Sequence, residues 1–206
     1  MKSYVTLTDA SAELTVLRSR FLSFVYHIEG EEEAAEKLAA LRRKYYDATH
    51  VCYAYVADER GVTSRFSDDG EPSSTAGAPI MSVIAGGEYK KVLVAVVRYF
   101  GGTKLGVGGL VKAYTDAAAA AVANASRRTM VYCELYEAET DYNTFGKIRR
   151  AAERGGGRIT DIGYGDRVRF VIAFPAGDNL LSGLVDLTGG KTEFINRGYR
   201  YEDYQM

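Results

Sequence analysis

The sequence of 206 residues has only two cysteines, three prolines and no tryptophan, and it contains no long uninterrupted apolar run. Cys52 and Cys133 lie far apart and belong to no CxxC pair, which argues against a disulfide framework and a zinc site. The first residues, MKSYVTLTDASAEL, include no apolar stretch of signal-peptide length, and no stretch reaches the roughly 18 apolar residues of a membrane span. These absences predict a cytoplasmic protein that makes no membrane contact.

An excess of charge of either sign is also missing, because 26 Lys and Arg face 27 Asp and Glu. No global positive field therefore favours nucleic acid, and any site for a polyanion must be local. Hydrophobic residues make up 47% of the chain, which is enough to build a real core. The length fits two small domains better than three.

The expected fold class is α+β, with domains at 1–130 and 131–206. The boundary is placed where the composition changes from alanine-rich to basic and then β-prone, between Arg127 and Val131. Periodicity in the first part predicts strands and helices in the ranges 4–28, 29–47, 50–58, 61–69, 73–85, 90–100 and 110–125. The second part predicts the order βαββαβ, which is the ferredoxin-like arrangement.

The segment SDDGEPSSTAGAP groups three carboxylates, Asp68, Asp69 and Glu71, just before a predicted helix. Carboxylates on one loop can bind a divalent metal through hard oxygen ligands, or one of them can act as a general acid or base. The structural alternative is a turn at Asp69 and Gly70. In that alternative the next helix is capped by Ser73, Ser74 or Thr75.

The segment VVRYFGGTKLGVGGLVKAY, which ends at Tyr114, joins a predicted buried strand to a helix through five glycines and a lysine. Glycine-rich turns and helix N-termini let backbone N–H groups approach an anion such as phosphate. The segment matches neither a Walker loop nor the GxGxxG fingerprint, and its glycines can instead serve tight turns and close packing. The candidate residues for binding an anion or nucleic acid are Arg98, Gly101, Gly102, Lys104, Gly106, Gly108, Gly109 and Lys112.

His50 and Cys52 occupy alternate positions of a predicted strand, so both side chains point to the same face. Two ligands without nearby partners make a weak metal site. A hydrogen-bonded structural histidine is the favoured interpretation.

The second part offers its own basic and aromatic positions. Lys147, Arg150 and Arg154 share one face of a predicted helix, and the strand RVRFVIAF gives alternating basic and aromatic positions. Basic residues beside exposed aromatics can contact RNA. Core packing of Phe170, Ile172 and Phe174 is the simpler interpretation of the strand.

The two motifs, DDGEPSSTAGAP and VVRYFGGTKLGVGGLVKAY, closely resemble those of the IMPACT family, which includes the bacterial YigZ-like proteins. SRFLSF and ATHVCYAY also resemble that family's pattern. The resemblance implies a first domain similar to the second domain of ribosomal protein S-five, with left-handed βαβ topology, and a ferredoxin-like second domain similar to one in elongation factor G. Ser74 stands where the family usually has glycine, and Thr103 stands where it usually has an aliphatic residue.

Three functions follow as hypotheses. The first is a translation-associated regulator that binds RNA or a ribosome-associated protein through the basic, glycine-rich segment. The second is an enzyme that acts on a small phosphorylated or anionic ligand, with a divalent metal or a carboxylate base at Asp68, Asp69 or Glu71. In the third, both motifs are purely structural.

Overall fold

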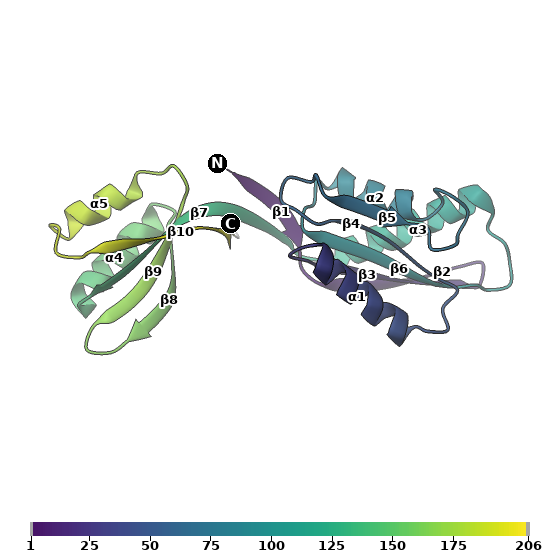
Figure 1. The fold of residues 1–206 in the computed structure, drawn as a ribbon, viewed down its shortest axis with the longest axis horizontal. Coiled ribbons are helices and arrows are strands. Elements are labelled where there is room, and N and C mark those ends of the chain that lie inside the picture. Colours follow the sequence, from purple (N-terminus) through teal and green to yellow (C-terminus); the bar gives the residue numbers. More distant parts are fainter. Residues whose placement is uncertain (1, 205–206) are drawn as a thin grey trace. The chain divides into compact units, whose positions relative to one another are not determined.

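The computed structural model describes residues 2–204. Contacts divide the described residues into two compact units, one comprising Tyr4–Thr129 and the other comprising 130–204 together with residues 2 and 3. Each unit carries its own sheet (Figure 1). No helix in the described part of the chain is long and apolar enough to cross a membrane.

The first unit is built on a sheet with strand order β2-β3-β6-β4-β5, in which every neighbouring pair is antiparallel. Its strands are β2 (Ala10–Val16), β3 (Ser19–His27), β4 (His50–Val56), β5 (Ser64–Ser67) and β6 (Val92–Tyr99). Its helices are α1 (Glu31–Lys44), α2 (Gly77–Gly86) and α3 (Gly106–Asn124). Since β3 and β4 both pair with β6, they run parallel to each other and α1 connects them.

Strand β6 is the middle strand of this sheet, and helices cover both faces of the sheet (Figure 1). Val92, Val94 and Val96 pack on the side of α2 and α3, whereas Leu93 and Val97 pack on the side of α1. This alternation follows from the twofold periodicity of a strand. It explains why the sequence of β6 is continuously apolar, and it places the side chain of the next residue, Arg98, toward α2 and α3.

The second unit has the order β7 (Arg127–Thr140), α4 (Tyr142–Arg154), β8 (Arg158–Tyr164), β9 (Val168–Pro175), α5 (Leu180–Leu187) and β10 (Phe194–Asp203). The strand order β10-β7-β9-β8, with antiparallel pairs throughout, is that of a ferredoxin-like domain. β1 (Ser3–Leu7) also pairs with β7. The predicted α+β class and the βαββαβ order are therefore confirmed, and Phe170, Ile172 and Phe174 are core residues of the second unit.

Two predicted helix starts were wrong, and both errors fall in the motifs. The helix expected from Ser73 begins at Gly77, because residues 72–75 form a turn in which Thr75 Oγ1 donates to the Pro72 carbonyl. The helix expected from Leu110 begins at Gly106, inside the glycine-rich segment. Helix propensity is poor for glycine, so the sequence did not indicate that start.

Candidate functional site

Both sequence motifs lie at the same end of the first sheet. The β-strand register pairs His50 with Arg98 and Arg20 with Tyr99, so β3 and β4 begin where β6 ends. Tyr53 pairs with Ser67, so β5 ends there too. The segments that follow β5 and β6 lead into α2 and α3, which places the carboxylate motif and the glycine-rich segment side by side at this edge.

A buried ion pair connects the two motifs. Arg98 Nη1 donates to Glu71 Oε1 at 2.5 Å, and the two side chains are only 5% and 3% exposed. The Arg98 guanidinium also lies over the rings of Phe21 and Phe100, at 5.5 and 5.6 Å from their centroids. Because Arg98 is enclosed in this way, it does not reach the surface with the other basic residues of its motif.

Three further side chains extend this network beyond the ion pair. Tyr114 Oη donates to Glu71 Oε1 at 2.7 Å, and the Cys52 thiol lies 3.3 Å from Tyr114 Oη. Burial raises the pKa of Cys52 to about 12, so the thiol is neutral and unreactive. His50 Nδ1 donates to the Asp69 carbonyl at 2.8 Å, while its Nε2 lies 3.8 Å from Glu71. His50 is therefore a hydrogen-bonded structural residue.

Asp68 and Asp69 are committed to backbone groups of the protein itself. Asp68 accepts hydrogen bonds from the N–H groups of Ser74, Ala76 and Gly77, so it occupies the start of α2 in the way a bound anion would. Burial alone would raise the pKa of Asp68, but these backbone donors outweigh it and hold the pKa below its usual value. The expectation that Ser73, Ser74 or Thr75 caps this helix was therefore wrong, because Asp68 accepts from its first N–H groups instead.

Asp69 makes its own connections within the turn that follows β5. It accepts from Val51 N–H at 2.7 Å and pairs with Arg42 at 2.8 Å. Asp69 and Gly70 both have positive φ, +44° and +88°, and Glu71 N–H donates to the Asp68 carbonyl, which makes a tight primed turn. The turn interpretation of this motif therefore describes the structure. Ser74 also has a positive φ of +62°, a conformation that glycine adopts at lower cost.

The glycine-rich segment is anchored at its first glycine. Gly101 N–H donates to Ser19 Oγ at 3.2 Å, and the same oxygen accepts from Arg98 Nη2 at 3.4 Å. A Cβ atom at Gly101 would lie 2.1 Å from the carbonyl carbon of Arg18, so only glycine fits against the turn between β2 and β3. The buried ion pair therefore positions the start of the segment.

The remainder of the segment exposes backbone donors at the start of α3. Leu105 is in the right-handed helical region and Gly106 has a φ of +72°, a succession that resembles the backbone turns whose neighbouring N–H groups bind anions. No side chain from Leu105 caps the helix, whereas α2 has Asp68. Lys104 is exposed beside this point and forms no ion pair with another described residue, while Lys112 pairs with Asp116 at 2.6 Å.

The predicted residues thus separate into two groups. Glu71 and Arg98 are buried together, and Asp68 and Asp69 bind the protein's own donors. Gly102, Lys104, Gly106 and Gly108 are exposed, and Gly109 is half-buried. Within residues 2–204, no group of three or more His, Cys, Asp or Glu side chains is arranged to hold a metal ion. Sequence reasoning missed Ser19 and Tyr114, which carried no local signal of their roles.

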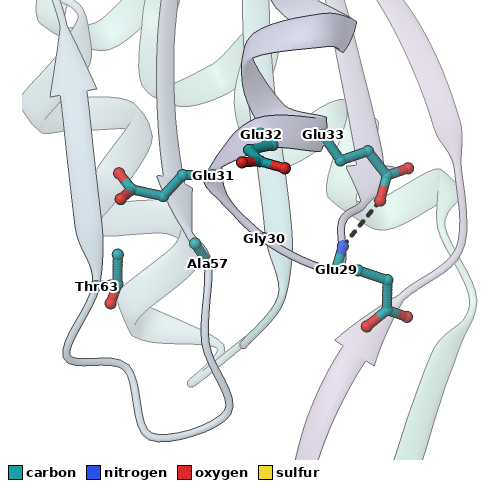
Figure 2. A pocket seen from close by; sticks show the side chains of 7 residues that line it. All are labelled: Glu29, Gly30, Glu31, Glu32, Glu33, Ala57 and Thr63. Carbon is teal, nitrogen blue, oxygen red and sulfur yellow. Dashed lines mark hydrogen bonds between the residues drawn. The ribbon is translucent and has the colours of Figure 1, made fainter.

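A separate pocket of about 520 Å³ lies at the start of α1 and is lined by four glutamates (Figure 2). Glu33 reaches back to accept the backbone N–H of Glu29 at 2.9 Å, which fixes the chain just before the helix. Glu31 accepts from Tyr55 Oη, and Glu29 pairs with Lys91 at 2.6 Å. Acidic residues in the first turn of a helix are stabilised by its dipole, so Glu31, Glu32 and Glu33 favour this helix start.

Two family models match separate parts of the chain. Residues 17–122 match the Impact N-terminal domain, and residues 139–191 match a domain of unknown function, DUF1949. The IMPACT family member YvyE of Bacillus subtilis (strain 168) is 30% identical over 196 residues, which cover 94% of this chain and 90% of that protein. The IMPACT family member YigZ of Escherichia coli (strain K12) is 32% identical over 163 residues, covering 78% and 80%.

Among solved structures, the crystal structure of a hypothetical protein superposes with a TM-score of 0.64 at 29% identity and covers 95% of this chain and 97% of its own. The fold and these matches define a two-domain α+β protein with an Impact N-terminal domain. The chain belongs to the IMPACT family.

Proposed function

We propose that this protein is a translation-associated regulator that binds RNA through the glycine-rich segment of its first domain. The observation that carries the proposal is the contrast between two neighbouring helix starts. The start of α2 is filled by Asp68, whereas α3 is preceded by Leu105, an apolar residue that cannot cap it, and begins at Gly106 with positive φ. Free helix N-termini favour anions, and a phosphate group supplies the missing acceptor.

The surroundings of this anion site favour a nucleotide over a small metabolite. Residues 102–104 and 106–108 are exposed, whereas sites for small molecules are usually enclosed clefts. Lys104 adds a point charge beside the backbone donors. Phe100 is 48% exposed, and an exposed aromatic side chain offers a base a surface for stacking on the side away from Arg98. Phosphate contact and base stacking together are typical of proteins that bind single-stranded RNA.

The carboxylate motif supports a positioning role in this proposal. Glu71 holds Arg98, and Arg98 shares Ser19 with Gly101, so the motif fixes where the glycine-rich segment starts. No carboxylate of the motif remains without a protein donor, so acid or base chemistry has no supporting observation. A site held rigid in advance loses less conformational freedom on binding.

Substitution at Gly106 tests the anion site directly. A side chain at this position meets no atom within 4 Å, and Asp and Asn both tolerate positive φ. Gly106→Asp should place an internal carboxylate beside the first N–H groups of α3 and abolish RNA binding. Gly106→Asn, whose amide oxygen also accepts from such N–H groups but carries no charge, is the matched control and should lower the affinity less than Gly106→Asp, as measured by fluorescence anisotropy with a single-stranded oligoribonucleotide.

The salt dependence gives a second measurement. Lys104→Ala combined with Lys112→Ala should weaken RNA binding and reduce the slope of log K against log salt by about 0.7 for each lost phosphate contact. Arg43→Ala with Arg60→Ala, two exposed bases elsewhere in the same domain, is the matched control. The proposal is wrong if the parent protein has no measurable RNA affinity, or if Gly106→Asp binds as tightly as Gly106→Asn.

A further inference from the structure

The second domain contains a groove of about 630 Å³ between its two helices. Lys147, Arg150, Glu153 and Arg154 of α4 line one side, and Leu187 at the end of α5 lines the other. The opposite face of α4 packs into the core through residues such as Ile148, so the cationic residues face away from the core. The sequence pattern had already placed three bases on one face of this helix.

The charges of this groove are largely uncompensated. Glu153 is already paired with Arg149 at 2.9 Å, and Arg150 uses only its Nε, which donates to the Gly146 carbonyl. The Lys147 ammonium and the Arg154 guanidinium form no ion pair with another described residue. Three cations therefore face the groove, and its single carboxylate is occupied.

The helix dipole explains only part of this arrangement. Cations stabilise a helix in its last turn, where Arg154 lies. Lys147 is in the first half of α4, where the dipole gives it no advantage. The line of cations from Lys147 to Arg154 extends about 10 Å along the helix axis. Such a line is complementary to an extended anionic chain.

The other wall of the groove indicates which kind of anionic chain fits. Leu187 is 45% exposed, so α5 presents an aliphatic side chain to the groove. None of the groove-lining residues is aromatic. Single-stranded nucleic acids are usually held by stacking of bases on aromatic rings, which this groove does not offer. Aliphatic contact beside cations suits a peptide that carries both carboxylates and aliphatic side chains.

We propose that the groove between α4 and α5 docks an acidic segment of a partner protein, with its carboxylates on Lys147, Arg150 and Arg154 and an aliphatic side chain against Leu187. This interaction is independent of RNA binding by the first domain, because it uses different residues and a different ligand. An extended peptide advances about 3.3 Å per residue, so carboxylates on alternate residues can reach successive cations.

The test uses the full chain and a fluorescein-labelled synthetic peptide of alternating Glu and Leu residues. The peptide should bind saturably, and Lys147→Glu with Arg154→Glu should lower its affinity about tenfold or more, because two attractions become repulsions. Arg43→Glu with Arg60→Glu changes the net charge equally in the other domain and should lower it less than about twofold. Leu187→Ser should weaken binding without changing its salt dependence.

Three results would overturn this assignment. The first is an absence of saturable binding by the peptide. The second is an equal loss in the groove variant and the charge-matched control, which would make this a merely solvated basic face. The third is binding of oligouridylate that displaces the peptide from the parent protein and is itself lost in Lys147→Glu with Arg154→Glu. That result would make the groove a nucleic-acid site. Lys147→Gln with Arg154→Gln supplies a second variant if charge reversal disturbs folding, and it should also weaken peptide binding.

Discussion

Replacement of Arg98 by Met should destabilise the first domain by about 3 kcal/mol or more, because it leaves the Glu71 carboxylate buried without its ion-pair partner. Glu71 is 3% exposed, so water cannot replace the guanidinium at 2.5 Å. Tyr114 still donates to the carboxylate at 2.7 Å, which places the loss at the lower end of the usual range. Methionine retains most of the apolar stem, so little of the loss comes from packing.

The double variant Glu71→Gln with Arg98→Met removes both charges together. It should recover most of the stability lost in Arg98→Met, because a neutral amide costs less to bury than an unpaired carboxylate. The two substitutions are in direct contact, so their effects should not add. Arg20→Met, which breaks an exposed pair with Glu13, is the control and should change stability little.

Two domains in one chain require an assay that reports the first domain alone. Cys52 is buried in that domain, so the rate of its thiol labelling in urea, in a Cys133→Ala background, follows its unfolding. A loss below about 1 kcal/mol for Arg98→Met would refute the reasoning, because it is the size expected of an exposed pair. Strict additivity in the double variant would refute it equally.

Three other predictions concern single residues. Burial raises the pKa of Cys52 to about 12, so this thiol should resist a disulfide reagent at pH 8 until the protein is unfolded. Burial would raise the pKa of Asp58, but backbone donors outweigh burial and lower the pKa to about 2. The stabilising effect of the Asp58 carboxylate should therefore be present above about pH 4 and lost as the pH falls toward 2. Asp58→Asn should remove this contribution to the acid dependence of the melting temperature. Gly101→Ala should lower the melting temperature because the new Cβ meets the backbone of Arg18. Gly108→Ala should raise the melting temperature through a gain of about 1 kcal/mol in helix propensity, because the new Cβ has no atom within 4 Å. Equal melting temperatures for the two variants would contradict this.

Much of the fold could be predicted from local patterns. The continuous apolar run of β6 indicated a strand covered on both faces, and the acidic start and basic end of α1 indicated its limits. The order of elements in the second domain followed from the alternation of strand and helix periods. These features depend on residues near one another in the chain, so the sequence contains them directly.

The helix starts at the candidate site were harder to predict because they depend on distant partners. Asp68 caps α2 from outside the helix. It accepts from the N–H groups of Ala76 and Gly77, which lie eight and nine residues later in the chain. The helix α3 starts among glycines, which disfavour helix in isolation, because Leu110 and the residues after it pack on the sheet. Local propensity therefore gave the wrong boundaries in both motifs.

The sequence by itself determined the family, the α+β class and the two motifs worth inspecting, because each depends on composition, periodicity or a contiguous run of residues. Only the tertiary structure decided which charged residues are ligand candidates. Arg98 and Lys104 are six positions apart and look alike in the sequence, yet Arg98 is enclosed with Glu71 and Lys104 is exposed. Burial and charge pairing arise from segments that meet only when the chain folds, so they assign Arg98 to positioning and leave Lys104 free to meet a ligand.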